Sequence, residues 1–130
     1  MLTYDDVIFL ADGLNFELRS SKHIAVLTDG SRIVNVFANK YAFHAEELAV
    51  TEYDRLKQKI KKPKIFIVRK SPENRLSRPC CHCCLLLRRF PQIRVFYSGS
   101  DGEFIEETKF DACHISHRRL EMGFCRRKVT

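Results

Sequence analysis

The sequence lacks the features that mark membrane, secreted and repetitive proteins. None of its apolar runs reaches the roughly 18 to 20 residues that a membrane span requires, so we expect no membrane partner. Asp5 and Asp6 follow Met1 closely, and no basic segment precedes an apolar stretch, so no secretory signal is expected. Internal repeats, low-complexity segments and linkers are also lacking. We therefore expect one intracellular domain, residues 1–130, in the cytoplasm or nucleus.

The chain does contain six cysteines and an excess of basic residues. Four of the cysteines, at 80, 81, 83 and 84, are too close together to join distant parts of a fold, so they indicate metal ligands or free thiols. The formal net charge of +7 favours phosphate-bearing partners, with a merely solvated basic surface as an equal alternative. Residues from about 125 to 130 form a basic tail that we expect to fray.

Hydrophobic periodicity and turn residues predict alternating helices and strands. Thr3 can cap a helix whose apolar residues recur every three or four positions, and Asp29-Gly30 is a strong hairpin signal. Pro63 ends a later helix, and the strand after it is apolar without alternation, as in a strand covered on both faces. This order predicts an α/β fold with a mixed sheet and helices on both faces. The predicted helices are 3–18, 44–61, 79–90 and 112–124, and the predicted strands are 23–28, 31–39, 64–69, 93–97 and 103–108.

Two short strings, His44-Ala45-Glu46 and Pro79-Cys80-Cys81-His82-Cys83, supply the ligands of a catalytic zinc site. Each string opens a predicted helix, and the spacing of Cys80 and Cys83 places both sulfurs on one face. The partial positive charge of a helix N-terminus favours the thiolate that Zn²⁺ requires. We therefore predict that His44, Cys80 and Cys83 bind Zn²⁺, that water takes the fourth position, and that Glu46 moves protons.

Two other arrangements of these ligands have to be considered. Cys81 and Cys84 offer a second pair with the same spacing, but the first pair is favoured because Pro79 directly precedes it. A closed structural zinc site could instead use Cys80, Cys83, Cys113 and His117. That arrangement leaves the His-x-Glu string unexplained. The roles of Cys81, Cys84, His114 and His117 remain open.

The pattern H-x-E followed by P-C-x-x-C resembles the zinc-dependent cytidine deaminase superfamily, from the first hairpin to the helix that carries the cysteines. The resemblance implies a three-layer α/β/α sandwich with a mixed five-stranded sheet. It also implies hydrolytic deamination of cytosine to uracil, with Zn²⁺ on His44, Cys80 and Cys83 and with Glu46 as the proton shuttle. Val95–Ser98 and the strings after it resemble, in addition, small deaminase-like proteins of large DNA viruses.

The same resemblance suggests five substrate contacts. Asn39, five residues before His44, fits the asparagine that contacts the sugar in polynucleotide cytosine deaminases, and it is also an ordinary turn residue. The backbone carbonyl of Arg78 would accept the base amino group, and the backbone N–H of Ala45 would meet the base carbonyl. Phe43 and Tyr97 are candidate stacking platforms, with core packing as the commoner role for such residues.

The sequence leaves three functions open, two of them enzymatic with different substrates. A free cytidine or deoxycytidine nucleoside or nucleotide is favoured, because the short turn over residues 98–102 predicts an antiparallel final strand pair, as in the free-cytidine branch. Single-stranded DNA or RNA is the alternative, supported by Asn39-Lys40, the basic charge and the aromatic residues near the pocket. His44 also disfavours the free-cytidine branch, in which many enzymes have cysteine at that position. Adenosine in tRNA is disfavoured, because Arg78 stands where that branch has glutamate. The third function is a non-catalytic, zinc-stabilised binding protein, and all three are compatible with a homo-oligomer.

Overall fold

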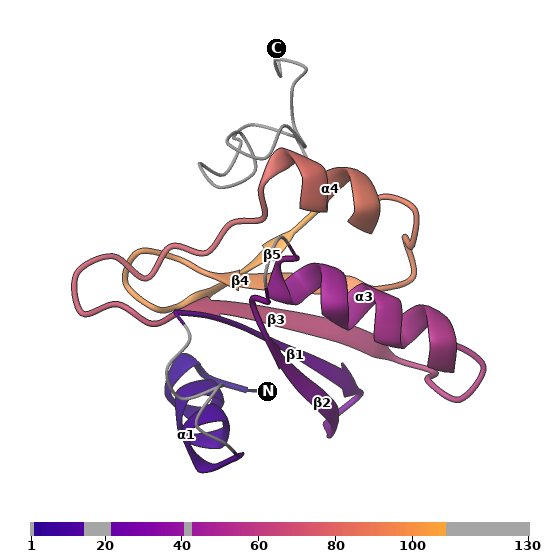
Figure 1. Ribbon diagram of the computed structural model, residues 1–130, viewed down its shortest axis with the longest axis horizontal. Helices are drawn as coiled ribbons and strands as arrows, with labels where there is room; N and C mark the ends of the chain where they lie inside the picture. The colour runs from indigo at the N-terminus through magenta and orange to yellow at the C-terminus, as the bar shows by residue number, and fades with distance from the viewer. Residues whose placement is uncertain (1, 15–21, 41–42, 109–130) are drawn as a thin grey trace.

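The computed structural model describes residues 2–14, 22–40 and 43–108, apart from the side chain of Cys81 (Figure 1). Residues 15–18 of the first predicted helix, the predicted helix at 112–124 and the basic tail at 125–130 lie outside these residues. The described helices are α1 (Tyr4–Leu14), α3 (Ala45–Leu56) and α4 (Cys81–Leu87). The described strands are β1 (His23–Asp29), β2 (Arg32–Ala38), β3 (Pro63–Arg69), β4 (Arg94–Ser98) and β5 (Phe104–Glu107).

The strands form one five-stranded sheet in the order β2-β1-β3-β4-β5. Strand β1 is antiparallel to both β2 and β3, strand β4 runs parallel to β3, and β5 is antiparallel to β4. The hairpin at Asp29-Gly30 forms as predicted, with Gly30 at a φ of 61°, which a side chain rarely adopts. The α/β class, the mixed five-stranded sheet and the antiparallel final pair are therefore confirmed.

The apolar residues of the central strands divide between two core clusters, because neighbouring residues of a strand point to opposite faces. On one face, Ala25 and Leu27 of β1 pack with buried residues of α3 and α4. On the other face, Ile24 and Val26 pack with Val7 and other buried residues of α1. Figure 1 shows α1 set apart from α3 and α4 across the sheet. Strand β3 contributes to both clusters, which explains its run of apolar residues without alternation.

The predicted bounds of two helices are wrong. Helix α3 ends at Leu56 and not at residue 61, and the chain after it contacts the β1–β2 hairpin. Asp29 Oδ1 accepts the N–H groups of Lys61 and Lys62, at 3.3 and 2.9 Å, and Gly30 N–H donates to the Lys62 carbonyl. Helix α4 spans Cys81–Leu87 and not 79–90, since Cys80 is extended. Within the described part of the chain, no helix is long and apolar enough to cross a membrane.

The sheet brings the starts of α3 and α4 to one edge. Because β1 is antiparallel to β2 and β3, its first residue lies beside their last residues, with His23 opposite Arg69 and Ile24 opposite Ala38. Helix α3 follows β2 and helix α4 follows β3. Both helices therefore begin at the edge where His23, Asn39 and Arg69 lie.

Replacing a core residue of β3 tests this layering. Ile67, which is 1% exposed, packs in the cluster under α3 and α4, whereas Ile33 on β2 is 39% exposed. We expect Ile67→Ala to lower the free energy of unfolding in urea by about 2–5 kcal/mol, because it removes buried methyl groups and leaves a cavity. Ile33→Ala is the matched control and should cost about 1 kcal/mol or less. Equal losses for the two variants would contradict the assignment of the core.

Candidate metal centre

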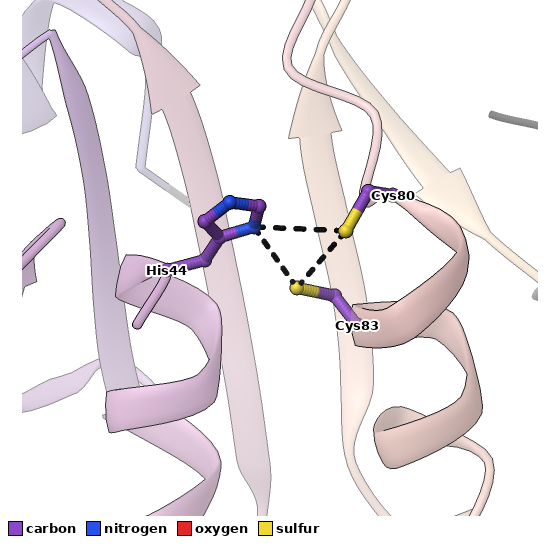
Figure 2. A group of neighbouring side chains, drawn as sticks. All are labelled: His44, Cys80 and Cys83. Carbon is purple, nitrogen blue, oxygen red and sulfur yellow. Dashed lines mark hydrogen bonds between the residues drawn. The ribbon is translucent and has the colours of Figure 1, made fainter. Parts of the chain in front are cut away.

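Three side chains from the two helix starts converge on one point. His44 Nδ1 lies 3.3 Å from Cys83 Sγ and 3.6 Å from Cys80 Sγ, and the two sulfurs are 3.6 Å apart. All three potential ligand atoms lie within 4.8 Å of one another. Figure 2 shows His44 reaching from the α3 side and both cysteines from the α4 side, so that the three atoms form a triangle. The predicted set of His44, Cys80 and Cys83 is thus brought together.

His44 is held by the hydrogen bonds that begin α3. Its backbone is extended, with φ −78° and ψ 155°, and its N–H donates to Oε1 of Glu47 at 2.7 Å. The next N–H, that of Ala45, donates to Oδ1 of Asn39 at 2.7 Å. These bonds satisfy donors at the start of the helix and fix the direction in which the imidazole leaves the chain.

The cysteines are positioned by the loop between β3 and α4. Ser77 Oγ donates to the Ile67 carbonyl at 2.7 Å, and Ser98 N–H donates to Ser77 Oγ at 2.9 Å. This buried serine ties the loop to β3 and β4 shortly before α4 begins. Cys80 then caps the helix in an extended conformation, and Cys83 follows one turn later, with both thiols buried.

The spacing of the three atoms fits a tetrahedral metal ion. With Zn–S distances of about 2.3 Å and Zn–N distances of about 2.0–2.1 Å, a tetrahedron separates two sulfurs by about 3.8 Å and sulfur from nitrogen by about 3.6 Å. The separations in this chain, 3.6 Å between the sulfurs and 3.3 and 3.6 Å from Nδ1, match these edges within a few tenths of an ångström. One imidazole and two thiols also form a donor set that Zn²⁺ prefers.

The two thiols differ in their affinity for protons. The hydrogen bond between the Cys80 and Cys83 sulfurs, reinforced by His44, lowers the pKa of Cys80 to about 3 against the opposing effect of burial. The same bond raises the pKa of Cys83, and burial and the Glu46 carboxylate raise it further. A second thiolate beside the first is repelled, so both sulfurs become ligands when a cation offsets their charge. A cation held by His44, Cys80 and Cys83 would therefore displace the proton of Cys83.

Glu46 lies beside the ligand atoms and is buried, with 6% of its surface exposed. Its Oε1 is 3.8 Å from His44 Nδ1. Glu46, His44 and Cys80 line a pocket of about 180 Å³ together with Asn39 and Arg78. Five residues that the sequence singled out therefore share one cavity.

The remaining predicted contacts lie differently. Asn39 and Ala45 were each expected to meet the substrate, and here the Asn39 carbonyl oxygen accepts the Ala45 N–H. The Ala45 N–H is therefore engaged within the protein, and the Asn39 amide nitrogen is the group left to face a ligand. Phe43 is 55% exposed, and Tyr97 packs against the core cluster under α3 and α4. The roles of these residues in substrate binding stay predictions.

The alternative ligands considered from the sequence are not part of the described metal-ligand group. Cys84 is buried, and its thiol donates to the Pro79 carbonyl at 3.5 Å; it does not belong to the metal-ligand group. The pair of Cys80 and Cys83 is thus the one that faces His44. Cys113 and His117, the other ligands of a closed structural site, lie outside the described residues.

Sequence reasoning missed several residues around the pocket. His23, Arg69 and Ser77 line it, and the buried Glu107 accepts a hydrogen bond at 3.0 Å from Arg78 Nε. His82 Nε2 lies 3.4 Å from Glu47 Oε2 and links the two helix starts. The ends of the predicted strands were the only signal for His23 and Arg69. That signal becomes specific only once the strand order is known.

Comparisons with protein-family models, with curated proteins and with solved structures yield no match to this chain. Inferences about its chemistry therefore depend on the residues themselves and on their arrangement.

Removing one thiol at a time tests the ligand set. We expect the full chain to bind about one Zn²⁺ or Co²⁺ and Cys80→Ser or Cys83→Ser to weaken binding by more than about 100-fold, because each change removes a ligand. Chelator competition measures the affinity, and the thiolate-to-Co²⁺ charge-transfer band reports sulfur coordination. Cys84→Ser is the matched control on the same helix and should bind as the wild type does. A loss with Cys84→Ser comparable to that with Cys83→Ser would contradict this ligand set.

The pocket histidine predicts a pH dependence of stability. Burial, followed by the positive charge of Arg69, lowers the pKa of His23 from 6.5 to about 4. The unfolded chain therefore takes up this proton first, and folding is favoured above about pH 6.5 and loses up to about 3 kcal/mol as the pH falls towards about 4. His23→Gln should flatten the curve over this interval in urea unfolding. Parallel curves for wild type and variant would be inconsistent with a neutral His23 in the folded state.

Proposed function

We propose that this chain is a zinc-dependent hydrolase that deaminates cytosine to uracil in a cytidine or deoxycytidine nucleoside or nucleotide. The observation that carries the proposal is the position of Glu46, a buried carboxylate 3.8 Å from the ligand nitrogen of His44, in the pocket that the metal ligands line. A purely structural metal site has no use for an acid–base group at that place.

The number of ligands also favours catalysis. Within the described residues, the group that can hold a metal comprises His44, Cys80 and Cys83, which leaves one corner of a tetrahedron for water or substrate. Two of these ligands line the pocket, so the fourth corner is reachable from it. When bound, Zn²⁺ supplies Lewis acidity and lowers the pKa of water towards neutrality.

The acid–base chemistry falls to Glu46. Its carboxylate accepts a proton from the attacking water and delivers it to the ring nitrogen beside the amino-bearing carbon. A second transfer, to the amino group, lets ammonia leave as the carbonyl of uracil forms. Water and cytosine thus become uracil and ammonia without any other reactant. Burial of Glu46 keeps bulk water from competing for the proton.

The arrangement of the elements is consistent with this proposal. Helix α1 packs on one face of the sheet and helices α3 and α4 on the other, as expected for the three-layer α/β/α sandwich of the cytidine deaminase superfamily that we propose for the chain. The antiparallel β4–β5 pair favours the free-cytidine branch. Deamination of cytosine in single-stranded DNA or RNA is the second candidate, supported by the net charge of +7.

Exchanging the Glu46 carboxylate for an amide tests the function. We expect the zinc-loaded chain to release uracil-containing product and ammonia from at least one of cytidine, deoxycytidine, their monophosphates and a cytosine-containing oligonucleotide. Glu46→Gln should bind zinc normally and lose about 10²–10⁴-fold in kcat, because the amide cannot carry the proton.

The matched control is Asp54→Asn, the same kind of change at an exposed position near the other end of α3, which should leave kcat unchanged. Full activity of Glu46→Gln would remove Glu46 from the mechanism. Zinc binding without turnover of any of the five substrates would favour the non-catalytic binding protein.

A further inference from the structure

Arg69, a residue that the proposed mechanism does not use, lines the same pocket as the metal ligands. It is the last residue of β3, and the antiparallel register sets it opposite His23. Its backbone is fixed, because Tyr4 donates a 2.7 Å hydrogen bond to the Arg69 carbonyl and Lys70 N–H donates to the Lys22 carbonyl. The guanidinium therefore extends from a rigid sheet edge and not from a surface loop.

One hydrogen-bond donor of the Arg69 guanidinium is buried. Its Nε is buried and, in the part of the chain that the structure describes, has no hydrogen-bond partner. Nor does any described carboxylate form an ion pair with it. A buried N–H without an acceptor costs free energy, and more so on a charged group, so a residue that carries such an atom and lines a pocket is a candidate for binding a ligand that accepts hydrogen bonds.

The charges around the pocket specify what kind of ligand fits. Arg78, the other arginine there, donates to the buried Glu107 at 3.0 Å and is committed to that pair. The low pKa of His23 leaves that side chain neutral at physiological pH. Glu46, the carboxylate that lines this pocket, lies beside His44. Arg69 is thus a cation among the residues that line the cavity, and the carboxylate there, Glu46, lies beside the metal ligand His44.

We propose that Arg69 binds the phosphate of the substrate, so that the chain acts on a nucleotide whose base lies at the metal ligands; this rests on the proposed function. A guanidinium presents a planar fork of N–H donors that matches the oxygens of phosphate, and its charge is permanent. The phosphate belongs either to a free mononucleotide or to a phosphodiester of a single strand, and both offer Arg69 the same chemistry.

Affinities for the reaction products test the contact between Arg69 and phosphate without requiring turnover. We expect UMP to bind the zinc-loaded full chain about 10- to 100-fold more tightly than uridine, measured by calorimetry, as for charge-assisted hydrogen bonds in a pocket. Arg69→Gln should abolish this advantage and leave the affinity for uridine within about twofold. Arg69→Lys should retain part of it, because the charge remains while the fork is lost.

Arg89→Gln is the matched control, since it removes the same charge from an exposed position outside the pocket. It should leave both affinities unchanged. A trinucleotide containing uracil identifies the source of the phosphate: dependence on Arg69 for the trinucleotide alone assigns a phosphodiester, and dependence for UMP assigns a mononucleotide. Equal binding of uridine, UMP and the trinucleotide overturns the proposal, as does an equal loss for all three in Arg69→Gln.

Activity distinguishes failure of this inference from failure of the proposed function. If UMP binds through Arg69 but cytidine, CMP and the oligonucleotide are all left unchanged, the deaminase is overturned and the phosphate site stands. If cytidine and CMP are deaminated with equal kcat/KM, and Arg69→Gln alters neither, the phosphate site is overturned and the deaminase stands.

Discussion

The pairing of β1 with both of its neighbours is the constraint on which the rest of the structure depends. Strand β1 is antiparallel to β2 along one edge and to β3 along the other, so its first residue meets the ends of both. A shift of one residue in either register would turn every side chain to the opposite face and separate the two apolar clusters from their helices. The hydrophobic pattern therefore fixes the place where α3 and α4 begin, and with it the geometry of the metal ligands.

Local patterns in the sequence predicted the strands, the hairpin and the ligand set, because each depends on residues close together in the chain. His44, Cys80 and Cys83 could be identified from the H-x-E and P-C-x-x-C strings, in which Pro79 distinguishes the first cysteine pair from the second. The end of α3 could not, because the chain that follows it is held by contacts distant in sequence, such as those of Asp29 with the backbone N–H groups of Lys61 and Lys62. Arg69 and His23 were missed for a similar reason: their proximity depends on strand order, which short-range patterns do not contain.

The candidate site separates opposite charges within one small cavity. Glu46 and the two sulfurs lie at the helix starts, where the partial positive charge of the helix ends favours anions. Arg69 comes from the sheet, and the Arg78–Glu107 pair flanks the same pocket from the loop and β5. The charged groups at the site thus come from five segments of the chain: the starts of α3 and α4, the end of β3, the loop before α4, and β5.

The triangle of His44, Cys80 and Cys83 also has a topological meaning. His44 and Cys80 are 36 positions apart in the sequence, and the chain between them includes all of α3 and β3. An ion held by these three residues is consequently a cross-link that closes a large loop. In the unfolded chain, a cross-link of that span removes conformational freedom equivalent to about 4 kcal/mol. The ion would thereby resist the separation of α4 from α3, so that its three ligands would stabilise the fold as well as hold the metal.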